Sequence, residues 1–444
     1  MVEVDPGKLE PGRTSVDHGV TARIKRSDAW RSAFRHAQID TPRGRALQSF
    51  SNVFLHVYPV KIPKRVLNLR YSLRLGFIAA VLFGILLVTG VYLMFVYTPS
   101  VGSAYGDMQN LKTGVGFGQL IRNVHRWSAH LMVLVVALHL VRVFYAGAYK
   151  KPREFNWVIG VMLLLLTLLF SFTGYLLPWD QLSYWAVTVG TGLVHYVPLF
   201  GGRLQDLLIG GPQVGQNTLL RFYALHVAVL PMLLVLFLTV HIWRVRKDGF
   251  AVQRTTVGAF AEEATERPAA AAMVQAAPAL YGGRVRLLGV VDRESVTEAE
   301  RPVDDTVFTW PHLLVRHVVV ALGTAAVVLV LGVAFSAPLH GLANPNLTPA
   351  SEKAPWYFAG LQELLSHFDP LVAGILVPGG AVLIFLLLPY IDRNPDTRAS
   401  HRKVAIILFS ILLAIAVGLT VIGTFFRGPG WTFVAPWTHS YIEF

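Results

Sequence analysis

Two apolar stretches of the sequence each carry a pair of histidines, and neutral imidazole is a good ligand for transition metals. His125 and His139 lie 14 residues apart in the first stretch, and His226 and His241 lie 15 residues apart in the second. Four α-helical turns span about 14 residues, so both members of a pair share one helix face, about 21 Å apart along the axis. Two such helices side by side oppose His125 to His226 and His139 to His241. Each opposed pair then offers two nitrogens from opposite sides, as a haem iron with two axial histidines requires.

A haem-free function is the alternative explanation of these four residues. A single histidine in a membrane helix more often pairs with a polar group or lines a cavity, and four are also compatible with a proton or metal path through a transporter. The two matched depths favour haem, because polar groups in hydrocarbon are costly and are rarely retained without a use.

Two glycine pairs repeat the histidine spacing. Gly76 and Gly90 lie 14 residues apart in one apolar stretch, and Gly160 and Gly174 lie 14 apart in another. A missing side chain lets a flat macrocycle approach the backbone closely. We therefore predict that these glycines bind the haems, although small residues also serve helix packing in membranes.

Long apolar helices must position these residues. The chain has 444 residues, of which 54% are hydrophobic and only 15% are charged, as is typical of a polytopic membrane protein. We predict an all-α integral membrane fold with seven transmembrane helices, arranged as a four-helix dihaem bundle and a three-helix C-terminal half. The apolar stretches lie at about 75–97, 127–147, 157–177, 222–242, 313–335, 371–390 and 404–425.

Changes in composition along the chain divide it into four parts. The predicted parts are an N-terminal cytoplasmic or interfacial segment (1–60), a four-helix haem-binding domain (61–246), a charged, Ala-rich cytoplasmic linker (247–306) and a three-helix domain (307–444). Residues 179–216 are too polar to span the membrane and are predicted to form short helices on the outer face, as is the stretch at about 354–368.

The net charge of +13 is concentrated in particular segments. Lysine and arginine cluster at 23–26, 61–70, 142–153, 244–254 and 393–403, whereas the alternate loops are poorer in them. With seven spans this pattern predicts a cytoplasmic N-terminus and a periplasmic C-terminus. The basic clusters therefore indicate topology and contact with anionic lipid, not nucleic-acid binding.

The sequence contains no cysteine. This excludes disulfides, thiolate-held iron–sulfur clusters and thioether-linked haem on this chain. Any such cluster or c-type haem therefore belongs to a partner. Because the first 70 residues are polar and basic, we also expect no cleaved signal peptide.

Four stretches resemble the cytochrome b family, the quinol-handling subunits of bc-type complexes. They read NVHRWSAHLMVLVVALHLVRV, KKPREFNWVIGV, GYLLPWDQLSYWAV and VGQNTLLRFYALHVAVLPMLL. The similarity is greatest to the form made as a four-helix cytochrome b6 and a separate three-helix subunit, and it runs from about residue 60 to 426, more weakly after 306. The chain resembles a fusion of both pieces, with seven spans where mitochondrial-type relatives have eight.

The resemblance implies a ligand set for two non-covalently bound b haems. It implies that His125 and His226 hold the iron of an outer-side haem, and that His139 and His241 hold the iron of an inner-side haem. No haem is expected to be attached covalently to this chain.

Several arginines occupy informative positions within the resemblance. Arg122 and Arg126 stand where the family places cationic partners of the outer haem propionates, and a carboxylate near hydrocarbon needs such a partner. Arg142 and Arg246 are candidates for the inner haem or for an inner-side quinone. Some relatives attach an extra haem through a cysteine at the inner end of the first helix, and Arg74 occupies that place here.

The resemblance also implies an activity. The chain is expected to be a subunit of a quinol:cytochrome c oxidoreductase of the respiratory chain, in a dimeric, multi-subunit complex of a bacterial inner membrane. Quinol would be oxidised at the outer face, with one electron passing to a Rieske-type iron–sulfur protein and then to a c-type cytochrome or equivalent acceptor. The other electron would cross through both haems to an inner-side quinone. The alternative is a dihaem subunit that connects the quinone pool to another periplasmic redox enzyme without dividing the electrons.

One departure from the family pattern concerns the quinol site. Many relatives carry Pro-Glu-Trp-Tyr there, and the glutamate accepts a proton from quinol. Here Pro355 takes the place of that glutamate, ahead of Trp356 and Tyr357, which remain the expected quinol contacts. Because quinol oxidation needs a base, Glu363 is a candidate for that role. Two further candidates are His367 and Asp369.

Overall fold

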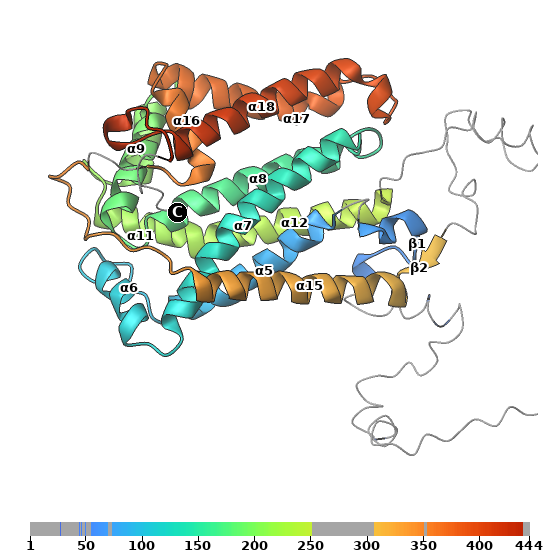
Figure 1. The fold of residues 1–444 in the computed structure, drawn as a ribbon, viewed down its shortest axis with the longest axis horizontal. Helices are drawn as coiled ribbons and strands as arrows, with labels where there is room; N and C mark the ends of the chain where they lie inside the picture. Colours follow the sequence, from blue (N-terminus) through green and yellow to red (C-terminus); the bar gives the residue numbers. More distant parts are fainter. Residues whose placement is uncertain are drawn as a thin grey trace, which may run out of the picture.

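The computed structural model describes residues 55–69, 73–250, 306–349 and 353–437, together with positions 27, 44, 46 and 49. The described chain is almost entirely helical (Figure 1), and seven of its helices are long and apolar enough to cross a membrane. The all-α multi-pass fold is therefore confirmed. Most of the N-terminal segment 1–60 and of the linker 247–306 lies outside the described residues, and the three boundaries between the four predicted parts stay predictions.

Four spans form the first half of the molecule. They are α5 (Leu75–Met94), α7 (Gly118–Tyr145), α8 (Glu154–Tyr175) and a continuous span built from α11 (Gln216–Ala224), η3 (Leu225–Val229) and α12 (Leu230–Asp248). α5 packs along α7, and α8 packs along α12 (Figure 1). Both histidine-bearing helices thus lie within one bundle.

The fourth span changes its winding where it carries His226. Residues Leu225–Val229 form a π-helical turn, and Pro231 follows directly at the start of α12. Proline has no N–H and its ring meets the carbonyl four residues earlier, so an α-helix cannot pass through it undisturbed. The wider turn accommodates the proline, and such π turns are frequent at functional sites.

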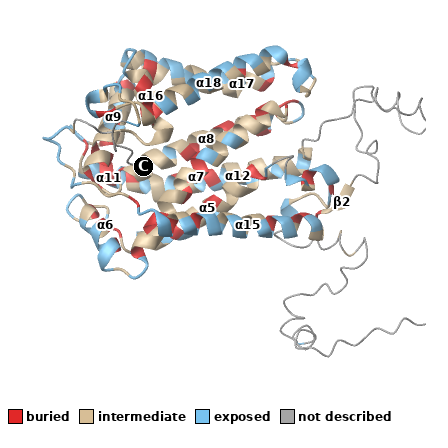
Figure 2. Ribbon diagram, viewed as in Figure 1, coloured by how far each residue is buried: buried red, intermediate tan, exposed pale blue. Residues whose placement is uncertain are grey.

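Three spans of the second half flank the four-helix bundle. They are α15 (Thr309–Ala334), the span of η6 (Leu371–Leu376) with α17 (Val377–Ile391), and α18 (Lys403–Phe425). α15 contacts α5 and α7 on one side, whereas α17 contacts α8 on the other (Figure 1). Apolar side chains on these three spans are widely exposed (Figure 2), as expected for helices that face lipid.

Short elements close both ends of the bundle. Near the start of α7, which we call the His125 end, lie α6 (Ala104–Thr113), α9 (Gln181–His195), α10 (Gly201–Ile209), α16 (Trp356–Leu365) and η8 (Pro429–Trp431) (Figure 1). The remaining short elements are η1 (Leu55–Val57), β1 (Lys61–Pro63), η2 (Lys64–Leu67), β2 (Thr306–Phe308) and η7 (Ala399–His401). β1 and β2 pair antiparallel, with Ile62 opposite Val307.

Hydrogen bonds join the two halves at the His125 end. Arg122 donates to the carbonyls of Ala337 and Pro338 at 2.8 and 2.6 Å. Asn123 donates from Nδ2 to the Gly332 carbonyl at 2.8 Å and accepts the Ala337 N–H at 2.8 Å. These backbone groups follow or end α15, where a helix leaves carbonyls without helical partners. Two adjacent polar side chains of α7 therefore satisfy the end of α15.

A buried ion pair joins the halves at the opposite end. Lys150 Nζ lies 2.6 Å from Asp392 Oδ2, and Tyr149 donates its hydroxyl hydrogen to the same oxygen. Burial opposes ionisation of Asp392, but the hydrogen bonds from Lys150 and Tyr149 hold its pKa below the usual value. Because an unpaired buried charge is costly, this contact ties the loop after α7 to the chain that follows α17.

An apolar core separates the two histidine levels. It contains Leu82, Met132, Leu166, Leu230, Leu234 and Val328, all at most 8% exposed. The first five come from the middle of their spans, between the two histidines or glycines that each span carries. The bundle therefore has a dry apolar layer at mid-depth and one imidazole pair on each side of it.

Candidate functional site

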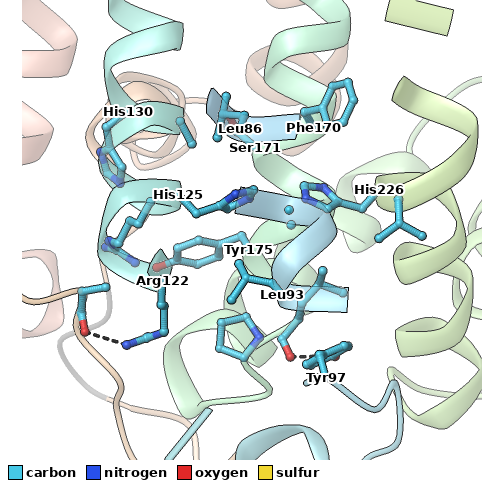
Figure 3. A pocket seen from close by; sticks show the side chains of 18 of the residues that line it. Leu86, Leu93, Tyr97, Arg122, His125, His130, Phe170, Ser171, Tyr175 and His226 are labelled. Atoms are coloured by element: carbon cyan, nitrogen blue, oxygen red, sulfur yellow. Dashed lines mark hydrogen bonds between the residues drawn. The ribbon is translucent and has the colours of Figure 1, made fainter. Parts of the chain in front are cut away.

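The four histidines meet in two facing pairs inside the bundle. His125 of α7 faces His226 of η3 with 6.4 Å between ring centres (Figure 3). His139 of α7 faces His241 of α12 with 6.5 Å between ring centres. The structure thus brings together both pairs that the sequence spacing opposes.

These separations fit one metal ion between two imidazoles. A bond from a metal to an imidazole nitrogen is about 2 Å long, and each nitrogen lies about 1 Å from its ring centre. Two rings on opposite sides of one metal therefore have centres about 6 Å apart, close to the distances in both pairs. Among the described residues there is no cluster of three or more His, Asp or Glu side chains suited to a protein-only metal site. A haem iron needs only two protein ligands, and the donor set fits it.

Threonines orient the two imidazoles at the His125 end. The Thr89 hydroxyl donates to the Ile85 carbonyl at 2.7 Å, so its oxygen must accept the hydrogen bond that joins it to His125 Nδ1 at 2.8 Å. Thr173 likewise donates to the Leu169 carbonyl at 2.9 Å and lies 3.2 Å from His226 Nδ1. A hydrogen on Nδ1 leaves the Nε2 lone pair free for a metal.

Sequence reasoning missed these threonines, although a signal exists. A Thr-Gly dipeptide occurs at 89–90 on α5 and again at 173–174 on α8. In both cases the threonine is at most 9% exposed and the following glycine lies against the same histidine. Thr-Gly also occurs at 113–114 and 191–192, but only at 89–90 and 173–174 does its glycine end a 14-residue glycine pair. That coincidence is the signal that would have predicted an orienting hydrogen bond.

The four glycines contact the histidine rings themselves. A β-carbon at Gly76 would lie 3.2 Å from His139, and one at Gly90 would lie 3.3 Å from His125. At Gly174 it would lie 2.5 Å from Cε1 of His226, closer than nonbonded carbons approach, whereas at Gly160 the nearest atom, in the His241 ring, is at 3.5 Å. Gly174, and to a smaller extent Gly76 and Gly90, therefore make room for imidazole, whereas a β-carbon at Gly160 would make an ordinary contact. Their predicted contact with a macrocycle stays a prediction.

A cavity of about 270 Å³ opens around the pair at the His125 end. Its wall is mostly apolar, and Figure 3 shows Leu86, Leu93 and Phe170 around the two imidazoles. The wall also includes Arg126, whose buried Nε has no hydrogen-bond partner among the described residues. An apolar cleft with a few directed polar groups is typical of a cofactor or ligand site.

The other arginines named from the sequence lie in different settings. Arg122 lines the same cavity, but two of its nitrogens are engaged by the carbonyls after α15. Arg142 lies one helical turn after His139 on α7, close enough for its positive charge to act on the His139 ring. Arg246 lies in the last turn of α12. Their predicted contacts with haem propionates or quinone stay predictions.

Trp356 and Tyr357 begin α16 beside this cavity. Tyr357 lines the cavity and shares a side-chain hydrogen bond with Ser171 of α8, and burial raises its pKa to about 12. Trp356 donates its indole N–H to Nδ1 of His130 on α7 at 3.1 Å. His130 was not named from the sequence, because a single histidine between two ligand histidines carries no spacing signal.

Glu363 lies in a different environment from Tyr357. Its carboxylate accepts hydrogen bonds from Arg427 at 2.6 and 2.8 Å, from Trp431 at 3.1 Å and from His367 at 2.9 Å, and it does not line the cavity. The bonds from Arg427 lower the pKa of Glu363 to about 2. A carboxylate with so low a pKa is a weak base, which suits a structural ion pair. The Glu363–Arg427 pair joins α16 to the chain that follows α18.

Other candidate bases also have structural contacts. His367 is half-exposed and bonded to Glu363, and Asp369 accepts the N–H of Leu371 at 2.9 Å. Residues 178–181 (PWDQ) also contribute to the cavity, through Pro178 and Asp180. Asp180 caps α9 by accepting the Ser183 N–H at 2.9 Å.

Two protein families match the sequence. The family described as "Cytochrome b/b6/petB" matches residues 61–249, and that described as "Cytochrome b(C-terminal)/b6/petD" matches residues 342–442. The cytochrome b6 of Gracilaria tenuistipitata var. liui is 47% identical over 190 residues, which are 43% of this chain and 87% of the relative. That of Acaryochloris marina is 46% identical over 190 residues, again 43% of this chain and 87% of the relative.

A solved structure extends the likeness to nearly the whole chain. A chain of a structure described as "Hyperthermophilic respiratory Complex III" superposes with a TM-score of 0.66 and covers 94% of this chain and 93% of its own length. Its sequence identity to this chain is 23%, so this likeness concerns the fold.

Proposed function

The chain belongs to the cytochrome b/b6 family, and from this premise we propose that it is the dihaem membrane subunit of a bc-type quinol-oxidising complex. The observation that carries the proposal is the presence of two facing imidazole pairs, 6.4 and 6.5 Å between ring centres, on opposite sides of an apolar layer. Haem b bound by such pairs supplies reversible one-electron chemistry at two depths of a membrane.

The side chains around the first pair suit an outer-side haem. His125 and His226 present Nε2, because Thr89 and Thr173 accept from Nδ1. The buried Nε of Arg126, which has no partner in the described part of the chain, suits a propionate, since guanidinium binds carboxylate with directed hydrogen bonds. His139 and His241, beyond the apolar layer, hold the inner-side haem in this proposal.

Quinol binds, in this proposal, in the wall of the cavity where α16 meets α7 and α8. Tyr357 and Ser171 provide hydroxyl groups there, and the apolar lining excludes water from the quinol ring. The family motif has a glutamate where this chain has Pro355, and Glu363 is held as the anion by Arg427. In our proposal the carboxylate of Glu363 therefore has a structural role, and quinol binds near the hydroxyl groups of Tyr357 and Ser171 instead.

The remaining parts of the proposal follow from electron balance. Quinol yields two electrons, and this cysteine-free chain has no iron–sulfur cluster of its own. We propose a Rieske-type protein and a c-type cytochrome or equivalent acceptor as partners, a second quinone on the inner side, and assembly as a dimer in a bacterial inner membrane. The N-terminus is cytoplasmic and the C-terminus periplasmic in this arrangement.

A second candidate function is favoured by one observation. Because proline replaces the usual glutamate and Glu363 is paired, the outer site lacks the carboxylate base of its relatives. A dihaem subunit that connects quinone to another periplasmic redox enzyme needs no divided electron path. Co-purification of a Rieske-type protein supports the first function, and a different redox partner in its place supports the second.

Haem counts in single-histidine variants test the ligand assignment. We expect His125→Ala and His139→Ala each to lose one of two b haems while the other pair keeps its own, measured by reduced-minus-oxidised spectra and haem per chain. The matched control is His317→Ala, which removes a buried imidazole that stacks on Phe77 with 4.0 Å between ring centres. Loss of no haem from either ligand variant would refute the assignment.

A further inference from the structure

His130 has a buried setting that the haem sites do not use. It lies on α7 five residues after His125, and its side chain lines the cavity near His125 (Figure 3). Tyr357 lines the same cavity. The centres of the Tyr357 and Trp127 rings each lie 5.6 Å from the centre of the His130 ring. Aromatic groups on α7 and α16 therefore fix this imidazole in the cavity wall.

The hydrogen bond from Trp356 decides which nitrogen of His130 carries the proton. An indole N–H can only donate, so His130 Nδ1, 3.1 Å away, must present its lone pair. A neutral imidazole with a free lone pair on Nδ1 carries its hydrogen on Nε2. Trp356 thus prepares His130 as a hydrogen-bond donor to the cavity.

The acids nearby are already engaged. Asp180 is the one acid among the described residues that line the cavity, and its two oxygens accept the backbone N–H groups of Ser183 and His340 at 2.9 and 3.1 Å. Glu363 is paired with Arg427. A ligand with polar ring oxygens would therefore meet a donor in this wall and no free carboxylate.

We propose that His130 is a quinol-binding residue, whose Nε2–H donates a hydrogen bond to one ring oxygen of the quinol. This inference rests on the proposed function. A quinol oxygen accepts such a bond, and a donor fixed in the cavity wall orients the quinol ring for oxidation. His130 takes up no proton in this role, because Trp356 occupies Nδ1. The residue contributes a contact that the family motif does not describe.

Two measurements on the purified complex test this role. The first is kcat/KM with decylubiquinol and with a short-tailed menaquinol, and the second is the dissociation constant of the matching quinones, followed by quenching of tryptophan fluorescence. Loss of one directed hydrogen bond should lower kcat/KM of His130→Ala about tenfold and weaken quinone binding similarly. His130→Gln keeps an N–H donor and should recover most of the loss. Both variants should keep two b haems per chain.

The control is His317→Gln, which alters a buried histidine outside the cavity and should bind quinone as the unaltered complex does. If His130→Ala loses haem, Trp356→Phe is used as the test variant in its place. This change removes the hydrogen bond to Nδ1 of His130, and it should weaken quinone binding by less than the tenfold expected for His130→Ala. Quinol oxidation and quinone binding that are unchanged in His130→Ala would overturn this inference and leave the proposed function standing. An unaltered complex that neither binds quinone nor oxidises quinol would overturn both.

Discussion

Replacing Gly174 by alanine should release the haem proposed between His125 and His226. The new β-carbon would lie 2.5 Å from Cε1 of His226, which is 0.9 Å short of the 3.4 Å at which ordinary contact begins. The imidazole must retreat by nearly that amount, which strains its bond to Thr173. Overpacking of this size costs about 1–3 kcal/mol, whereas alanine regains up to about 1 kcal/mol of helix propensity, so the protein should still fold.

The effect on haem should exceed the effect on stability. Displacing or reorienting a metal ligand lowers metal affinity about 10–100-fold, so haem per chain should fall from two towards one. Gly160→Ala is the matched control, because its β-carbon would meet the His241 ring at an ordinary 3.5 Å. Redox titration of the b bands, with haem extracted and counted, distinguishes the two sites.

The reasoning is refuted by either of two results. One is a Gly174→Ala protein with two haems at unchanged midpoint potentials. The other is an equal loss in Gly160→Ala, which would mean that any side chain at these depths is harmful whatever its distance from imidazole.

Two further predictions concern hydrogen bonds at the same end of the bundle. Thr173→Val removes the hydroxyl acceptor of His226 and leaves the Phe170 carbonyl, so the haem proposed there should bind about tenfold more weakly or titrate at a shifted potential, while the other haem stays unchanged. Thr324→Val on α15, whose hydroxyl donates to the Val320 carbonyl at 2.8 Å, is the control. Glu363→Gln should lower the melting temperature, since breaking a buried ion pair costs about 3 kcal/mol. Arg427 holds the pKa of Glu363 at about 2, below its ordinary 4.5, so this stabilisation is complete above pH 4.5 and is lost as the pH falls towards 2. The inflections of quinol oxidation between about pH 5 and 9 should therefore be the same in Glu363→Gln, and a displaced inflection would identify Glu363 as the base.

Hydropathy and helical spacing carried the fold prediction. Seven apolar stretches became seven spans, because hydrocarbon admits little else of that length. The ends of the helices were less predictable. α7 begins at Gly118, and polar residues follow. Gln119 donates to Asn123 at 2.7 Å, and Asn123 in turn donates to the Gly332 carbonyl near the end of α15. That partner lies more than 200 residues away and leaves no local pattern.

The same distinction holds within the site. The pairing of His125 with His226 followed from matched spacing on two helices. The bond from Trp356 to His130 and that from Arg427 to Glu363 join residues 226 and 64 positions apart, so spacing could not reveal them. The short β1–β2 pair was missed because each strand has only three residues and lacks alternation.

The hydrogen bonds from Arg122 and Asn123 to the end of α15 have a consequence for how such a protein is made. They need no peptide connection between residues 250 and 306, because the α7 side chains meet backbone groups of the second half directly. The Lys150–Asp392 ion pair does the same at the opposite end. Two separately translated polypeptides would find the same partners, so the instructions for docking lie in the membrane helices and their loops, and one gene or two can encode the same assembly.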